Sequence, residues 1–142
     1  MSRYIVDASI AVQLLIADTH TLETKALFRS IEDGNRLILP EFALLECANV
    51  LWKHVRFHGI SPVEAENLIK ALIGLDVVIT PAAGLLPRAL EIGLKHQLAV
   101  YDSVYIALAE QSGYPLITDD NRQASAAGAE GITLKAITDF DA

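Results

Sequence analysis

Residues 101–120 read YDSVYIALAEQSGYPLITDD and join a predicted helix to a predicted strand. Asp102 stands at the start of the helix, in which apolar residues recur at helical spacing. Pro115–Thr118 predicts a short buried strand, and Asp119 and Asp120 follow it directly. A helix that leads into such a strand is typical of parallel sheets with helices on both faces. The stretch therefore predicts an α/β fold with acidic side chains at a strand end.

The same alternation of strands and helices continues through the rest of the chain. Further strands are expected at Arg3–Val6, Leu37–Leu39, Val77–Thr80 and Ile132–Leu134. Helices are expected after Asp7 with Ser9 as N-cap, over Leu22–Glu32, Glu41–Phe57, Ser61–Gly74 and Leu85–His96, and from Asp120 to Ala127. No internal repeat or flexible linker divides the sequence. We therefore expect one α/β domain over residues 1–142, with a central, mainly parallel sheet.

The composition indicates where in the cell the protein is expected and which kinds of function are disfavoured. Apolar residues make up 52% of the 142 residues, yet no apolar run approaches the ~18 residues of a membrane helix. The amino end lacks the features of a signal peptide, and the single cysteine, Cys47, favours a reducing cytoplasm. We expect the surplus apolar surface to cover a partner or a second subunit. The net charge of −7 argues against a general basic nucleic-acid surface, but cations bound to clustered carboxylates would invert the charge locally.

Four acidic residues stand where an active site is expected. Asp7 ends the first strand and Asp120 follows a later one, so both lie at the carboxyl edge of the sheet, where open parallel sheets bind ligands. Asp102 and Glu46 are placed to approach that edge from flanking helices. Each has a structural alternative: Asp102 and Asp120 are good helix N-caps, Asp7 could satisfy loop amides, and Glu46 could lie on a solvated face.

A cluster of carboxylates suits hard divalent cations such as Mg²⁺ or Mn²⁺, which take oxygen ligands. A metal ion activates water, and the same ion or a second one ~3.5–4 Å away stabilises the leaving oxygen in an in-line displacement. Without metal, the carboxylates repel one another, and at least one should have a raised pKa.

A polar stripe runs along the predicted helix over Glu41–Phe57. Glu46, Asn49, Lys53 and Arg56 are spaced three, four and three residues apart, which puts them on one face. This stripe could form a cleft wall, with Lys53 and Arg56 in contact with RNA phosphates. A solvated helix face is the alternative for the two cations.

Four segments give the sequence its resemblance to a known family. They are Ile5–Ser9 (IVDAS), Glu46–Leu51 (ECANVL), Tyr101–Ala109 (YDSVYIALA) and Leu116–Asp120 (LITDD). In order and separation they resemble the PIN-domain family over essentially the whole chain, and especially the VapC-type toxins of VapBC toxin–antitoxin pairs. The third segment is the most specific, and the four together are strong. The resemblance implies a Rossmann-like α/β/α sandwich.

The resemblance also implies an endoribonuclease that depends on Mg²⁺ or Mn²⁺. It assigns Asp7 and Asp102 as principal metal ligands, Glu46 as the acid from the long helix, and Asp120 as the fourth acid with Asp119 as its competitor. Ser9 and Thr118 resemble hydroxyls that support the cluster by hydrogen bonds, and Asn49, from the polar stripe, is expected to support it as well. It further implies homodimers and a small antitoxin that occupies an apolar groove. Two alternatives remain: a non-catalytic PIN-like module that binds partners, and an aspartyl phosphotransfer domain with Asp7 as nucleophile. The second lacks the aspartate that many aspartyl phosphatases carry two positions after the nucleophile.

Overall fold

Parallel strands form a central four-stranded sheet in the order β3-β2-β1-β4. The computed structural model describes residues 1–141. The strands are β1 (Arg3–Val6), β2 (Arg36–Pro40), β3 (Val78–Thr80) and β4 (Leu116–Ile117). Because β1 pairs with β2 on one side and with β4 on the other, the strand order reverses between β1 and β4. Such a reversal opens a ligand-binding crevice at the carboxyl ends of the strands.

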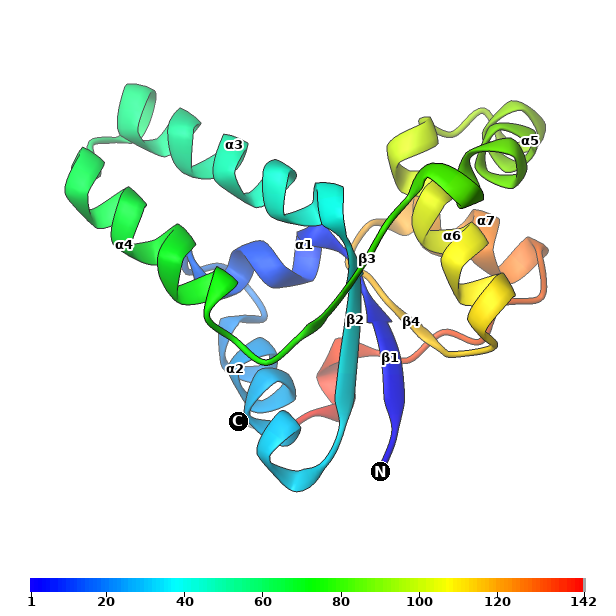
Figure 1. Ribbon diagram of the computed structural model, residues 1–142, viewed down its shortest axis with the longest axis horizontal. Coiled ribbons are helices and arrows are strands. Elements are labelled where there is room, and N and C mark those ends of the chain that lie inside the picture. Colours follow the sequence, from blue (N-terminus) through cyan, green and yellow to red (C-terminus); the bar gives the residue numbers. More distant parts are fainter. Residues whose placement is uncertain (142) are drawn as a thin grey trace.

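Helices cover both faces of this sheet (Figure 1). They are α1 (Ala8–Ala11), α2 (Thr21–Arg29), α3 (Glu41–His58), α4 (Pro62–Ile73), α5 (Leu86–His96), α6 (Val100–Ser112) and α7 (Asn121–Ala129). Short 3₁₀ turns occupy Val12–Leu14, Ser30–Asp33, Ala83–Leu85 and Ile137–Asp139. α1 to α4 lie on one side and α5 to α7 on the other, which gives the three layers that the sequence predicted. Across residues 1–141, none of the helices has the length and apolar character needed to cross a bilayer.

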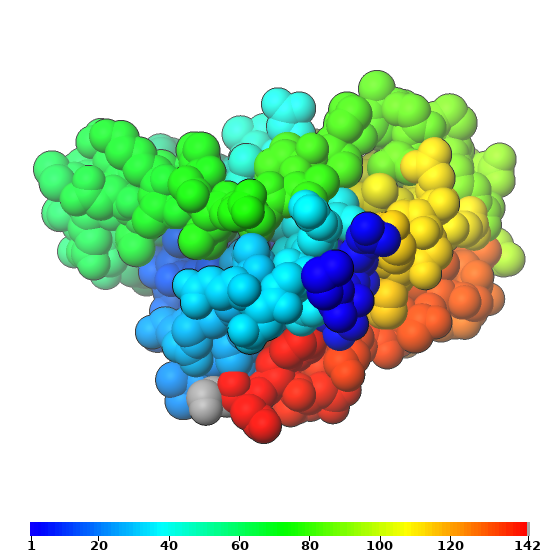
Figure 2. All heavy atoms as spheres, turned by 60° about the horizontal axis from the view of Figure 1, so that its bottom comes forward, coloured from blue at the N-terminus to red at the C-terminus, as the bar shows by residue number. Residues whose placement is uncertain are grey.

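The core lies between the sheet and its flanking helices. Ile5, Leu37, Leu39, Leu116 and Ile117 are fully buried, as expected for parallel strands covered on both faces. α6 is buried continuously from Ser103 to Ala109. On the face of the molecule drawn in Figure 2, the amino-terminal residues (dark blue) lie beside the segments coloured cyan and yellow, with the carboxyl-terminal segment (red) directly below. The rings of Tyr4 and Phe140 pack edge to face, with 5.6 Å between their centres.

Gly93 allows α5 to approach the start of α6 closely. A Cβ at this position would lie 2.7 Å from the carbonyl oxygen of Leu98 and 3.2 Å from Ser103 Oγ. The carbonyl oxygen of Gly93 also accepts a hydrogen bond from the Leu98 amide at 2.9 Å. This contact fixes the turn that leads into α6, and thereby places Asp102 in the first turn of that helix.

Two predicted helix starts were wrong. Asp7, not Ser9, caps α1 by accepting a hydrogen bond from the Ile10 amide, while the Ser9 hydroxyl donates to the Asp7 carboxylate. α6 starts at Val100, so Asp102 is not its N-cap. Several residues near each start have capping side chains, and tertiary contacts decide which one is used. Asp120 does cap α7, as predicted.

Two predicted elements are shorter than expected. The helix predicted over Leu22–Glu32 divides into α2 and a 3₁₀ turn that ends at Gly34 in the left-handed conformation. The strand predicted at Ile132–Leu134 is a single bridge between Leu134 and Leu116. This segment meets β4 at one residue and then leads into the last 3₁₀ turn, so it has no room to extend the sheet.

Candidate active site

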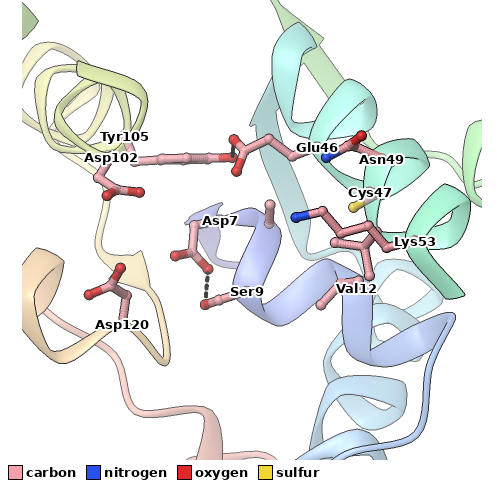
Figure 3. A pocket seen from close by; sticks show the side chains of 12 residues that line it. Asp7, Ser9, Val12, Glu46, Cys47, Asn49, Lys53, Asp102, Tyr105 and Asp120 are labelled. Carbon is pink, nitrogen blue, oxygen red and sulfur yellow. Dashed lines mark hydrogen bonds between the residues drawn. The ribbon is translucent and has the colours of Figure 1, made fainter. Parts of the chain in front are cut away.

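The four predicted acids line one pocket of about 340 Å³ at the carboxyl end of the sheet (Figure 3). Asp7 follows β1, Glu46 lies on α3, Asp102 lies on α6, and Asp120 immediately precedes α7. The other residues of the lining are Ala8, Ser9, Val12, Cys47, Asn49, Val50, Lys53 and Tyr105. Lys53 is the one cation among these lining residues, so four carboxyl groups share the pocket with a single ammonium group.

Asp7 is the most deeply buried of these acids, with 3% of its surface exposed. Its Oδ1 accepts hydrogen bonds from the Ser9 hydroxyl at 2.7 Å and from the Ile10 amide at 3.2 Å. Burial raises the pKa of Asp7 to about 7 against the hydrogen bonds from Thr118 and Ser9, which lower it, and the charge of Asp120 adds to the rise. Asp7 therefore keeps its proton to near neutral pH when no cation neutralises the pocket.

The Thr118 hydroxyl shows how a proton on Asp7 fits the site. Thr118 Oγ1 contacts Asp7 Oδ2, lies 2.8 Å from Gln123 Oε1, and accepts a hydrogen bond from the Asp120 amide at 3.0 Å. One hydroxyl proton cannot serve both the carboxylate and the amide oxygen. If Asp7 is protonated, it donates to Thr118 and Thr118 donates to Gln123, so every contact has its proton. The Gln123 amide group is held by a second bond, from Nε2 to the Asp102 carbonyl oxygen at 3.0 Å.

Glu46 reaches the pocket from α3 and is held there by α6. The hydroxyl of the buried Tyr105 donates a hydrogen bond to Glu46 Oε1 at 3.2 Å. Burial raises the pKa of Glu46, the bond from Tyr105 lowers it, and the charge of Asp102 raises it. Asp102 on α6 therefore acts electrostatically on Glu46 on α3 across the pocket.

Asp102 and Asp120 face the same space from neighbouring helices (Figure 3). Burial raises the pKa of Asp102, the charge of Asp120 raises it further, and the charge of Arg122 lowers it. Asp120 Oδ1 accepts hydrogen bonds from the amides of Arg122 at 2.9 Å and Gln123 at 3.1 Å. Asp120 is therefore both a helix cap and a pocket acid, because Oδ1 caps α7 and Oδ2 is left for the pocket.

Asp119, the alternative fourth acid, is absent from the pocket lining. Its Oδ2 accepts a hydrogen bond from Gln13 Nε2 at 2.6 Å and lies 2.9 Å from His20 Nδ1. The bond with Asp119 raises the pKa of His20. Of these two adjacent acids, the structure brings Asp120 into the pocket and uses Asp119 to tie the end of β4 to the segment before α2.

The polar stripe of α3 is divided between two environments. Asn49 and Lys53 line the pocket together with Glu46. The Arg56 guanidinium instead lies over two aromatic rings, 5.8 Å from the centre of Trp52 and 5.5 Å from that of Phe57. Only one of the two predicted RNA-contacting cations therefore lies at the acids.

Sequence reasoning missed two residues that hold the acids. Tyr105 stands three residues after Asp102, so the helical repeat puts the two side chains on neighbouring positions of α6, and this spacing could have identified it. Gln123 is fully buried and contacts Thr118. Its signal in the sequence is weak, because it is one amide side chain in a segment rich in alanine.

The donor set fits a hard divalent cation. Carboxylate oxygens are the ligands that Mg²⁺ and Mn²⁺ prefer, and the raised pKa values of Asp7, Glu46 and Asp102 reflect burial and negative charge that a cation would neutralise. Throughout residues 1–141, no three histidine, cysteine or acidic side chains converge closely enough to hold an ion as they stand. Coordination would therefore require side-chain rotation or water between ion and carboxylate, and Mg²⁺ usually keeps several waters.

The sequence and fold match known proteins over most of the chain. Residues 4–129 match the PIN domain family. A relative named Ribonuclease VapC3, from Pyrobaculum aerophilum, is 32% identical over 124 residues, which cover 86% of this chain and 92% of the relative.

Solved structures with low sequence identity share the fold. PAE2754 from Pyrobaculum aerophilum has a TM-score of 0.74 at 21% identity, covering 97% of this chain and 92% of its own. VapBC2 from Rickettsia felis, bound to a DNA fragment from its promoter, has a TM-score of 0.71 at 10% identity, covering 94% and 98%. These matches confirm the predicted α/β architecture. By its sequence and its fold, the chain belongs to the PIN domain family.

Proposed function

We propose that this protein is a metal-dependent endoribonuclease that acts as the toxin of a type II toxin–antitoxin pair. The proposal depends on one observation: Asp7, Glu46, Asp102 and Asp120 reach a common pocket from four separate elements. Mg²⁺ or Mn²⁺ is the proposed cofactor, and an RNA phosphodiester is the proposed substrate. The relative named Ribonuclease VapC3 supports the substrate class, since the match covers most of both chains.

The pocket residues would divide the work between binding the cation and orienting the ligands. Asp7 and Asp102 would bind the cation, and Glu46 and Asp120 would complete its oxygen ligands directly or through water. When bound, the cation supplies Lewis acidity to the phosphodiester and lowers the pKa of nearby water. Asp7, with a pKa of about 7, would release its proton on binding, because a positive charge favours the carboxylate.

Neighbouring side chains would keep these ligands in place and guide the substrate. Ser9 and Thr118 hydrogen-bond to the two oxygens of Asp7, and such bonds orient metal ligands. Lys53, on the wall opposite Asp102 and Asp120 in Figure 3, would pair with a phosphate of the RNA. Since the protein carries a net charge of −7, RNA binding would depend on such local cations and on the metal.

The proposed antitoxin site is an apolar groove between α3 and α4. A pocket of about 270 Å³ lies there, lined by Ala48, Leu51, Trp52, Val55, Pro62, Ala65, Glu66 and Ile69. Trp52, which lines this groove, is 56% exposed, and exposed apolar surface of this kind marks protein interfaces. The structural neighbour VapBC2 supports this partner class.

We propose that a second copy of the chain covers Leu86, Leu90 and Leu94, which are exposed at four-residue spacing on α5. The cytoplasmic location stays a prediction.

The aspartyl phosphotransfer alternative is disfavoured by the surroundings of Asp7. Its side chain is buried, and both of its carboxyl oxygens have hydrogen-bond partners, Ser9 and Thr118. A phosphate acceptor must be reached by the bulky phosphoryl donor, and only 3% of the Asp7 surface is exposed, whereas a cation needs far less room. The partner-binding alternative is separated from the nuclease by an assay for catalysis.

The test is cleavage of a circular RNA, which has no ends for an exonuclease, with Mg²⁺, Mn²⁺ or excess EDTA. We expect cleavage with either metal and none with EDTA. Asp102→Asn should reduce the rate by about a hundredfold or more, because it removes a proposed metal ligand. Asp119→Asn is the matched control: it makes the same chemical change outside the pocket and should stay within about threefold of the wild type. Equal rates for both variants and the wild type would remove the assigned site, and calorimetry with Mn²⁺ would show whether metal binds at all.

A further inference from the structure

A second polar pocket lies beside the candidate active site, at the start of α7. It has a volume of about 380 Å³ and is lined by His96, Leu98, Asn121, Arg122, Ser125 and Ala126. The two pockets have opposite character, since this lining contains the guanidinium of Arg122 and no acid, whereas the first contains four acids. They adjoin along the chain, because Asp120 lines one and Asn121 begins the lining of the other.

Arg122 connects the two pockets. Its Nη2 donates a hydrogen bond to the Gln97 carbonyl oxygen at 2.7 Å, which anchors the side chain at the end of α5. Its backbone amide donates a hydrogen bond to Asp120 Oδ1 at 2.9 Å, so Arg122 directly adjoins a carboxyl group of the acidic pocket. Within residues 1–141 it takes part in no ion pair.

Other cations of this region are already neutralised. Arg88 pairs with Glu91, Glu110 and Glu130 at 2.8–3.1 Å, and Lys95 pairs with Glu130 at 3.1 Å. The ring of His96 at the wall of the second pocket is held by Glu130 Oε2, 2.6 Å from its Nε2. Unlike these side chains, Arg122 has no acidic partner within residues 1–141, so its charge remains available to a ligand next to the acidic pocket.

The polar groups around Arg122 are side chains rather than free helix amides. Asp120 already accepts hydrogen bonds from the amides of Arg122 and Gln123 at the start of α7. Asn121 and Ser125 are four residues apart on α7, so an amide and a hydroxyl line the pocket one above the other. A guanidinium flanked by such neutral donors suits the oxygens of a phosphate group.

We propose that this second pocket binds a backbone phosphate of single-stranded RNA, next to the scissile bond held at the acidic pocket. Arg122 contacts the phosphate oxygens, and Asn121 and Ser125 add hydrogen bonds. The RNA strand then runs from the pocket of Arg122 into the acidic pocket, which a bound metal ion would make cationic. Local positive charge of this kind would let a polyanion bind to a protein of net charge −7. The inference rests on the proposed function only for the identity of the substrate as RNA.

The test measures equilibrium binding by fluorescence anisotropy of a labelled single strand of roughly ten nucleotides, a length typical for one binding groove. All proteins carry Asp102→Asn to prevent cleavage, and the buffer contains Mg²⁺ at a series of salt concentrations. Arg122→Gln removes the charge but keeps a donor for the Gln97 carbonyl. We expect the Kd to rise about five- to tenfold and the slope of log Kd against log salt to fall by about 0.7, the value for one phosphate contact on a single strand.

Arg36→Gln is the matched control, because it removes the same charge from an exposed residue at the amino end of β2, opposite the pockets. It should leave Kd and slope nearly unchanged, and Arg122→Lys should retain most of the slope. Equal effects of Arg122→Gln and Arg36→Gln, no effect of either, or no RNA binding at all would overturn the proposal. Thermal unfolding of each variant identifies loss through misfolding. If wild-type protein cleaves no RNA while binding depends on Arg122, the proposed nuclease falls and the phosphate pocket stands.

Discussion

The Tyr105 hydroxyl on α6 donates a hydrogen bond to Glu46 Oε1 on α3 across 3.2 Å, and so connects two helices on opposite sides of the candidate active site (Figure 3). Tyr105 is almost completely buried, so its hydroxyl has a fixed direction. The bond opposes the rise in the pKa of Glu46 that burial causes. Tyr105 thus favours both the position and the charge state that Glu46 needs to bind a cation.

Tyr105→Phe should therefore weaken metal binding more than it weakens the fold. We expect the Mn²⁺ concentration for half-maximal RNA cleavage to rise about tenfold or more, with recovery of rate at high Mn²⁺. The free energy of unfolding should fall by only about 1 kcal/mol, the typical cost of one hydrogen bond. Tyr101→Phe, which changes an exposed ring of the same helix, is the control and should leave both quantities unchanged. A Mn²⁺ dependence that does not move in Tyr105→Phe would contradict this role.

Asp7 should make the metal-free protein less stable as pH rises. Its pKa in the folded protein, about 7, lies above the ordinary 3.8, so the folded state binds more protons between these values. The free energy of unfolding should be highest below about pH 4 for this group and decline as pH rises through about 7. The difference corresponds to an upper figure of about 4 kcal/mol.

Asp7→Asn removes this titration and should be more stable than the wild type at pH 8, but not at pH 4. Urea unfolding in EDTA at both pH values measures the difference. Adding Mn²⁺ should stabilise the wild type and not Asp7→Asn, because the bound cation replaces the proton. A constant difference between the two proteins across this pH range would show that Asp7 titrates normally.

Gly93→Ala should destabilise the contact between α5 and α6. Its Cβ would lie 2.7 Å from a backbone oxygen, which cannot move without shifting the turn into α6. We expect a loss of about 2–3 kcal/mol. Gly128→Ala is the control on α7: nothing lies within 4 Å of its Cβ, so the reduced freedom of the unfolded chain should leave stability equal or higher by up to about 1 kcal/mol. Thermal unfolding of both variants gives the comparison.

Glu130 should protect the fold against acid. Side-chain hydrogen bonds from His96 and Lys95 are the two largest causes that lower the pKa of Glu130 from the ordinary 4.5 to about 2. A lowered pKa contributes stability above about pH 4.5 that is lost as pH falls toward 2. Glu130→Gln should cost about 1–2 kcal/mol at pH 7, since its partners are partly screened by solvent. Glu91→Gln, which removes a mostly exposed partner of Arg88, should cost less than about 0.5 kcal/mol, and an equal cost would argue against the special role of Glu130.

The acidic pocket was predictable because its members stand at positions that topology dictates. Strand ends of a parallel sheet meet at one edge, so Asp7 and Asp120 had to approach each other once their strands were identified. The choice between Asp119 and Asp120 was beyond the sequence. It depends on which way a two-residue strand directs the chain as it leaves the sheet, and on Gln13 and His20, which are distant in sequence and hold Asp119.

The helix starts and the fate of Arg56 show a different limit. Periodicity identifies which side chains share a helix face, but not what lies opposite that face. Lys53 and Arg56 belong to one stripe, yet only Lys53 is near enough to the sheet to line the pocket. Arg56 lies close to the end of α3, and its guanidinium is placed over aromatic rings of its own helix.

The order in which the acids occur along the chain has a consequence for synthesis. Asp7 is made before the other three acids, but β1 meets its neighbour β4 only when residues 116 and 117 have been made. A chain that stalls or is cut before this point lacks Asp120 and the hydroxyl of Thr118. Under the proposed function, copies that end before Thr118 would therefore be harmless to the cell that makes them, and hydrolytic power would arise only once residues 118–120 have been made.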